Sequence, residues 1–315
     1  MKIHNRSVSV ETWSFFNAWS SGVGTIFHRI KNELKIHSLE VSHFDDDKID
    51  FQEFAAQWGV KRSSGKTARD DSSPKIVGFH APSLLFDNNF FDQQVAEIAD
   101  LADALGTSNV TIMDDNLMEQ KYGSVTCYIK LLVKTAKALR ERKTPINVFF
   151  HLFEPHLLPI GAPADAQNPE TRQGSNPSAL ELLLTHDKKR VVGIQLDTHW
   201  LACGGYTSPN QFLDFMVSLG VETRDTFLKR QLSIHLSDML ANGDECALGK
   251  GVVSCDQWLD FVRDTPSVQN VILEFRHEVQ DKAAYVDVFQ LLADSLDWMN
   301  NIYSQTQGEK TEFAK

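Results

Sequence analysis

Residues 231–275 read QLSIHLSDMLANGDECALGKGVVSCDQWLDFVRDTPSVQNVILEF. This stretch predicts one complete strand–helix–strand unit, with an apolar strand at Gln231–Leu236, a helix at Asp256–Arg263 and a second apolar strand at Asn270–Phe275. Both strands are nearly continuous apolar runs, which is typical of strands covered on both faces. A right-handed crossover through the helix would place them parallel in one sheet.

The same alternation of short apolar runs and longer amphipathic stretches fills most of the chain. Six further strands are predicted at Ser7–Thr12, Ser38–His43, Lys75–Ala81, Asn109–Asp114, Ile146–Glu154 and Val191–Asp197. Seven further helices are predicted at Gly22–Leu34, Asp50–Trp58, Phe90–Leu105, Ser124–Arg142, Ser178–His186, Asn210–Leu219 and Ala283–Tyr303. Eight strands alternating with eight helices favour a single (β/α)8 TIM barrel, with parallel strands inside and helices outside.

A doubly wound open sheet is the alternative. A nucleotide-binding sheet of that kind would carry a Gly-rich turn after its first strand, and the first unit of this chain has none. We therefore expect one barrel domain over residues 1–303. The polar residues 304–315 are expected to form a disordered tail.

Composition excludes several classes of function. The chain has 315 residues and a formal net charge of −11, which disfavours binding to a phosphate backbone. No apolar run reaches the roughly 18 to 20 residues that a membrane span needs, and the N-terminal sequence resembles no signal peptide. The four cysteines show no disulfide or zinc spacing. We expect a cytoplasmic protein with reduced thiols and neither nucleic-acid nor membrane partners.

Acidic or imidazole side chains lie at or near the ends of the last four predicted strands. They are Glu154, Asp197, His235 and Glu274, separated by 43, 38 and 39 residues, which is one strand–helix unit each time. Because the carboxyl ends of parallel strands meet at one rim of a barrel, we expect these side chains to converge there. A single histidine in a strand is usually a core residue, so only the four residues taken together indicate a functional site.

Three carboxylates and one imidazole are ligands that suit a divalent ion such as Mn²⁺, Co²⁺, Mg²⁺ or Zn²⁺. Three carboxylates buried together without a cation would repel one another and would be costly to desolvate. The cluster therefore predicts one bound divalent metal ion, with Mn²⁺ as the favoured candidate.

A series of short motifs follows the predicted strands in order. They are SVSVETWSF, SLEVS, GFHAPS, FEPH, LDTHWLACGG, IHLSDM, LGKGVVSCDQW and ILEF. In this order and spacing, over residues 7–303, the chain resembles the xylose isomerase-like TIM barrels, which include sugar and sugar-phosphate isomerases and epimerases. The resemblance is to the superfamily and to no particular member.

The resemblance implies roles for individual residues. The four strand-end residues match the metal ligands of the superfamily. Positions near the substrate or around the ligands are matched by His156 and Asp238, and His80 and Glu40 would face the same rim. Gly249 and Gly251 match a turn that leads into the seventh helix.

The sequence departs from the superfamily after the sixth strand. Many members carry histidine three residues after the strand-six aspartate, whereas this chain has Trp200 there and His199 one residue earlier. Trp200 could stack on a sugar face or pack against a neighbouring loop, since aromatic side chains serve both uses. His199 is a candidate member of the ligand shell.

The resulting hypothesis is a metal-dependent isomerase or epimerase of a ketose-type sugar. The metal would polarise a carbonyl and stabilise an enediolate. Glu154 and Glu274 would then remove and return a proton at the adjacent carbon. Asp197 and His235 would mainly hold the ion, and Asp238 would orient its neighbours.

Two alternatives stay open at this stage, and a third is disfavoured. A lyase that dehydrates a hydroxy-keto acid would use the same metal site, and Arg276, two residues past Glu274, could bind the carboxylate of such a substrate. A catalytically silent barrel could serve as a binding partner. Abasic-site endonucleases share the barrel but need more histidines than these strand ends offer. The substrate and its phosphorylation state stay undetermined, and a homo-oligomer is possible by resemblance alone.

Overall fold

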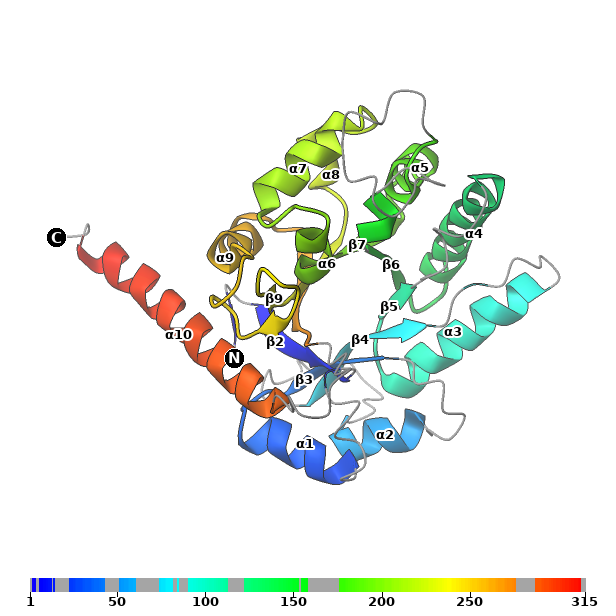
Figure 1. The fold of residues 1–315 in the computed structure, drawn as a ribbon. Coiled ribbons are helices and arrows are strands. Elements are labelled where there is room, and N and C mark those ends of the chain that lie inside the picture. Colours follow the sequence, from blue (N-terminus) through cyan, green and yellow to red (C-terminus); the bar gives the residue numbers. More distant parts are fainter. Residues whose placement is uncertain are drawn as a thin grey trace.

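The structure is a computed structural model, shown in Figure 1. It describes residues 2–3, 6–12, 14, 23–42, 51–60, 74–81, 84, 90–112, 122–152, 154–157, 176–275 and 287–312. Arg276 lies outside these residues.

Eight parallel strands close into a barrel. They are β2 (Arg6–Glu11), β3 (Ser38–Val41), β4 (Lys75–Ala81), β5 (Asn109–Ile112), β6 (Asn147–Leu152), β7 (Val192–Asp197), β8 (Leu232–Leu236) and β11 (Val268–Leu273). Each strand pairs in parallel with its neighbour, and β2 pairs with both β11 and β3, which closes the ring. The prediction of a (β/α)8 barrel is confirmed. The short β1 (Lys2–Ile3) adds an antiparallel pairing to β2.

Helices surround the strands (Figure 1). The predicted ones are found as α1 (Val23–Asn32), α2 (Phe51–Trp58), α3 (Phe91–Leu105), α4 (Tyr122–Arg140), α5 (Ala179–His186), α7 (Pro209–Ser218), α9 (Cys255–Asp264) and α10 (Val288–Glu312). The sequence did not predict the short elements η4 (Glu154–Leu157), α6 (Thr198–Cys203), α8 (Arg224–Phe227), β9 (Asp238–Met239) and β10 (Glu245–Cys246). None of the helices in the described part of the chain is long and apolar enough to cross a bilayer.

Local signals explain where several helices begin and end. Ser208 caps α7 in a reciprocal capping box with Gln211, and Pro209 occupies the first turn. The Ser178 side chain caps α5 by accepting a hydrogen bond from the backbone N–H of Glu181. Gly106 ends α3 in the left-handed conformation, with φ of 67°.

The C-terminal tail differs from the prediction. Residues from Ser304 onward were expected to be disordered, but α10 continues as a helix to Glu312. The residues involved include Gln, Glu and Lys, which are good helix formers and need no packing partner to extend an existing helix. In Figure 1, this end of α10 projects away from the barrel.

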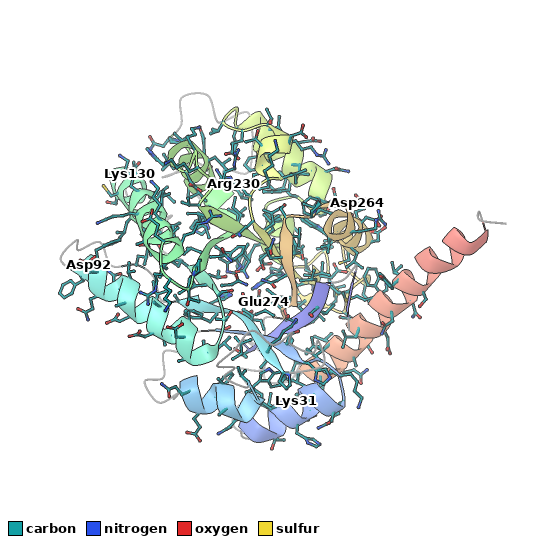
Figure 2. All side chains as sticks on the ribbon, turned by 180° about the vertical axis from the view of Figure 1, so that it is seen from behind. Lys31, Asp92, Lys130, Arg230, Asp264 and Glu274 are labelled. Atoms are coloured by element: carbon teal, nitrogen blue, oxygen red, sulfur yellow. The ribbon has the colours of Figure 1, made fainter. Side chains whose placement is uncertain are left out.

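Polar side chains fill the barrel interior. Along β7, buried Ile194 and Leu196 alternate with buried Gln195 and Asp197, and other strands alternate in the same way. The polar set faces the barrel axis, because Gln195 on β7 donates hydrogen bonds to Glu40 on β3, across the barrel. The apolar set packs against the outer helices. Figure 2 shows Glu274 at the centre of the ring of strands.

Candidate metal centre

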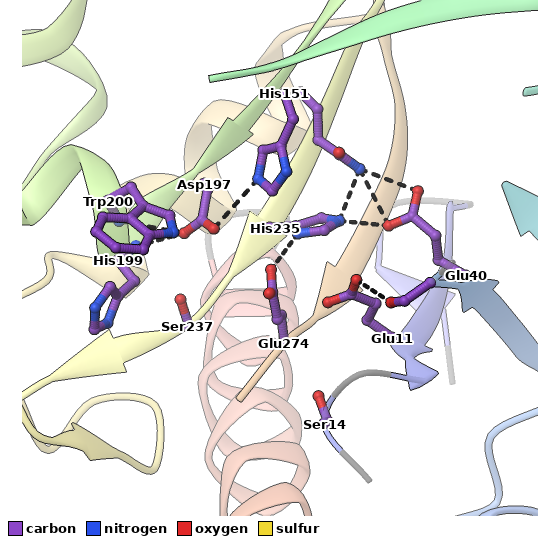
Figure 3. A network of polar contacts seen from close by, with 12 residues as sticks. Glu11, Ser14, Glu40, His151, Asp197, His199, Trp200, His235, Ser237 and Glu274 are labelled. Atoms are coloured by element: carbon purple, nitrogen blue, oxygen red, sulfur yellow. Dashed lines mark hydrogen bonds and ion pairs between the residues drawn. The ribbon is translucent and has the colours of Figure 1, made fainter. Parts of the chain in front are cut away.

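Four buried side chains from consecutive strands meet at the carboxyl end of the barrel. They are His151 on β6, Asp197 on β7, His235 on β8 and Glu274 directly after β11 (Figure 3). One ligand atom from each lies within 4.8 Å of those of the other three. Two imidazoles and two carboxylates at this spacing form a donor set that suits a divalent transition-metal ion.

Strand register and one helix cap position these ligands. Asp197 pairs with His235 in the β7–β8 ladder, which places them side by side. Asp197 also caps α6, since its Oδ1 accepts hydrogen bonds from the backbone N–H groups of His199 and Trp200 at 3.0 and 3.3 Å. The other oxygen, Oδ2, faces Nε2 of His151 at 3.4 Å. The α6 N-terminus thus holds Asp197 with one oxygen toward the centre.

Glu154 is placed differently from the prediction. The strand was expected to end at Glu154, but β6 ends at Leu152 and Glu154 begins the short helix η4. The structure does not describe its side chain, so its role as a ligand and catalytic residue stays a prediction. On the same strand, sequence reasoning missed His151. No local signal marked it, because only the β6–β7 ladder, in which His151 pairs with the axis-facing Gln195, shows that it faces the barrel interior.

A second group of buried polar residues adjoins the first. His80 on β4 contacts Glu40 on β3, with 3.1 Å between Nε2 and Oε2. The same Oε2 contacts Nε2 of His235, while Nδ1 of His235 contacts Glu274. Glu11 on β2 lies on the other side of His80, with 3.7 Å between Oε1 and Nδ1. His80 and Glu40 thus lie beside His235, and their role around the substrate or the ligands stays a prediction.

These contacts shift the ionisation of the groups in the metal-free chain. Burial opposes the charge on His235, but Glu274 and Glu40 outweigh it and raise its pKa well above the ordinary value. Burial likewise opposes ionisation of Glu40, yet His235 and His80 lower its pKa below the usual range. Burial and the carboxylates of Glu274 and Glu40 raise the pKa of Glu11 well above the ordinary value, against the influence of His235. The site therefore favours added positive charge.

The structure also places three other predicted residues, which are His156, His199 and Trp200. His156 is buried in η4, with its ring centroid 4.8 Å from that of Phe150. His199 and Trp200 lie in the first turn of α6, with ring centroids 5.5 Å apart. Their backbone contacts to Asp197 place both next to the metal centre (Figure 3).

Asp238 organises the loop that follows β8. Its Oδ2 accepts hydrogen bonds from the backbone N–H groups of Gly249 and Gly251, at 3.0 and 2.9 Å. Its Oδ1 accepts from the N–H groups of Met239 and Val253. A Cβ atom on Gly251 would lie 2.1 Å from the carbonyl oxygen of Met239, so only glycine fits there. Asp238 thus holds the backbone of this loop, and its place around the substrate or the ligands stays a prediction.

Two thiols near this loop, Cys246 in β10 and Cys255 at the start of α9, are expected to be unreactive. Burial, with Asp238 and Glu245 nearby, raises the pKa of Cys246 to about 12. Burial and Asp238 also raise the pKa of Cys255. Since the thiolate is the nucleophile, iodoacetamide at pH 8 should modify the exposed Cys127 and leave Cys246 and Cys255 unmodified. Peptide mass spectrometry, with urea-unfolded protein as control, measures this. Modification of Cys255 as fast as Cys127 in the folded chain would contradict it.

Comparisons with known proteins define the class of fold. No protein-family model matches the sequence, and no curated protein matches it. A sugar phosphate isomerase/epimerase structure from Parabacteroides distasonis aligns with a TM-score of 0.66 at 14% identity, over 93% of this chain and 95% of the other. L-ribulose 3-epimerase aligns with a TM-score of 0.60 at 10% identity, over 98% of each chain.

A third structure is that of the IOLI protein with a bound zinc atom. It aligns with a TM-score of 0.56 at 11% identity, over 95% of this chain and 98% of the other. At such identities the likeness defines the fold. The chain therefore has the fold of the xylose isomerase-like TIM barrels, as its sequence motifs indicated.

Proposed function

We propose that this protein is a divalent-metal-dependent isomerase or epimerase of a sugar-type hydroxy-carbonyl substrate. The observation that carries the proposal is the convergence of His151, Asp197, His235 and Glu274 at the carboxyl end of the barrel. This is the end where enzymes of this architecture keep their catalytic residues. The shared fold with sugar isomerases and epimerases supports the same class of reaction.

The donor set narrows the choice of metal. Two imidazoles beside two carboxylates favour Mn²⁺, Co²⁺ or Zn²⁺, because Mg²⁺ prefers oxygen ligands and retains water. Glu154, if its side chain turns toward the centre, would add a third carboxylate and favour Mn²⁺.

The bound ion would polarise the substrate carbonyl and so acidify the adjacent C–H bond. We propose that Glu274 takes or returns the proton at that carbon, with Glu154 as its partner. Asp197, His151 and His235 would hold the ion. His199 and Trp200, on the turn that caps Asp197, would contact the substrate, and the flat indole of Trp200 offers a surface for a sugar ring.

A direct test is to incubate the Mn²⁺-loaded protein with a panel of ketopentoses and ketohexoses in D₂O and to analyse the products by NMR. The proposal predicts a new isomer or epimer, formed only with metal and absent with Glu274→Gln. Deuterium at the carbon next to the carbonyl would report proton exchange with solvent. The lyase alternative predicts instead that a hydroxy-keto acid loses water, and that result without any sugar isomer would overturn the proposal.

A further inference from the structure

We propose that Thr198 and Ser14 are positioning residues of the metal centre. Their hydroxyl groups tie together the ends of strands that carry metal ligands, and these contacts set the affinity for the ion by fixing how far apart the ligands lie. This inference rests on the metal centre of the proposed function. It assigns a role to two buried hydroxyl groups that neither the ligand set nor the proton transfer uses.

Thr198 joins the end of β7 to the end of β8. The ladder between these strands has its last register pair at Asp197 and His235. β7 goes no further, because α6 begins at Thr198 and leads the chain out of the sheet. Beyond this point the Thr198 hydroxyl donates a hydrogen bond to the backbone carbonyl of Ser237 at 2.7 Å and accepts one from its N–H at 2.9 Å. One side chain thus connects the two strand ends directly after the pair of ligands.

This contact can control the geometry of both ligands. Thr198 follows Asp197 directly, and Ser237 lies two residues after His235. Both Thr198 and Ser237 are buried, so that water cannot readily take the place of the hydroxyl. A shift of Thr198 relative to Ser237 would therefore change the separation of the two ligand side chains.

A second hydroxyl joins the end of β11 to the segment after β2. Ser14 accepts a hydrogen bond from the backbone N–H of Phe275, with 2.9 Å between the two atoms. Phe275 follows Glu274 directly, and both lie past the end of β11 at Leu273. Ser14 is buried and belongs to the polar residues around the metal centre (Figure 3). Glu274 is therefore also held by a hydroxyl contact beyond the end of its strand.

Fixed ligand positions matter for the affinity of a metal site. Imidazole and carboxylate ligands bind such an ion at about 2.0–2.2 Å, so the ion binds most tightly where the ligand atoms already lie close together. The carboxylates of Asp197 and Glu274 repel each other until the ion is bound, and the two hydroxyl contacts oppose their separation. Loss of a group that holds metal ligands in place commonly lowers metal affinity by about 10- to 100-fold.

The test measures the dissociation constant of Mn²⁺ for the full-length protein, from the electron paramagnetic resonance signal of the free ion. We expect Thr198→Val, which keeps the shape of threonine without its hydroxyl, to weaken Mn²⁺ binding by about 10- to 100-fold. Thr198→Ser retains the hydroxyl and should bind Mn²⁺ nearly as tightly as the wild type. Ser14→Ala removes the second contact and should also weaken binding.

The matched control is Ser38→Ala. Ser38 on β3 is buried, and its hydroxyl donates a hydrogen bond to the backbone carbonyl of Val8 on β2 at 2.9 Å. This contact likewise joins adjacent strands, but Ser38 is the first residue of β3 and lies at the amino end of the barrel. Ser38→Ala should lower the thermal midpoint, measured by circular dichroism, and leave Mn²⁺ affinity unchanged. The same measurement verifies that each variant is folded.

The possible results separate this inference from the proposed function. Wild-type Mn²⁺ affinity in folded Thr198→Val and Ser14→Ala would overturn the inference and leave the proposed function intact. Thr198→Ser as weak as Thr198→Val, or equal weakening by Ser38→Ala, would also overturn it, because affinity would then not depend on these hydroxyl groups. If Thr198→Val does not fold, Ser14→Ala decides alone. Absence of Mn²⁺ binding by the wild type would overturn both proposals.

Discussion

Glu274→Gln is expected to lower turnover by about three orders of magnitude at saturating Mn²⁺, since a positioned acid–base group contributes roughly 10²- to 10⁴-fold. Glutamine has the shape of glutamate but cannot take a proton. Glu274 is 3% exposed and contacts His235, so the isosteric change should leave the fold in place. Steady-state kinetics on the substrate found in the sugar panel measures the effect.

The Mn²⁺ concentration must be raised for this variant, because it also removes a charge from the metal centre. The control is Glu33→Gln, which makes the same chemical change at the protein surface just after α1 and should retain full turnover. If Glu274→Gln at saturating metal kept more than a tenth of wild-type turnover, Glu274 would not be the proton-transfer group.

Arg230→Met is expected to reduce the free energy of unfolding by about 3–5 kcal/mol, the usual cost of removing one partner from a buried ion pair. Arg230 is fully buried just before β8 and forms ion pairs with Asp187 at 2.8 Å and Glu222 at 2.7 Å. Methionine fills much of the space but leaves both carboxylates without their cation. Urea unfolding followed by circular dichroism measures the loss.

The matched control is Arg263→Met. Arg263 pairs with Asp260 and Asp264 at the protein surface, where such a pair contributes less than about 1 kcal/mol. Arg230 lies at the opposite end of β8 from the metal centre, so its variant should still bind metal when folded. Equal destabilisation by both substitutions would contradict the structural role given to Arg230.

The barrel could be predicted from sequence because each strand and helix carries its own signal. The run KIVGFHA predicted β4 with its observed bounds, Lys75–Ala81, and the helix predicted at Asn210–Leu219 is found as α7, Pro209–Ser218. The polar lining of the barrel interior could not be predicted from these apolar runs. Buried polar residues such as Gln195 and Ser233 alternate with the apolar ones and face the axis, which the composition of the strands alone did not reveal.

The candidate site was less accessible to sequence reasoning. Asp197, His235 and Glu274 stood out because they lie at or near the ends of predicted strands at regular spacing. His151 lies inside a strand, and only the register between β6 and β7 places it beside the others. The role of Asp238 depends on a loop that returns to it from Gly249 and Gly251, a contact that no local pattern encodes. Glu11 likewise lies beside this group because it pairs with Glu40 in the β2–β3 ladder.

The most direct test of a metal-dependent function is the metal content of the full-length protein, purified without chelator and measured by mass spectrometry beside Asp197→Ala. Asp197 supplies a charged ligand atom to the candidate metal centre, so its removal should release the bound ion. The account predicts at least one Mn, Co or Zn per wild-type chain and a clear loss in the variant. Absence of metal in the wild type, even after dialysis against Mn²⁺, would contradict it.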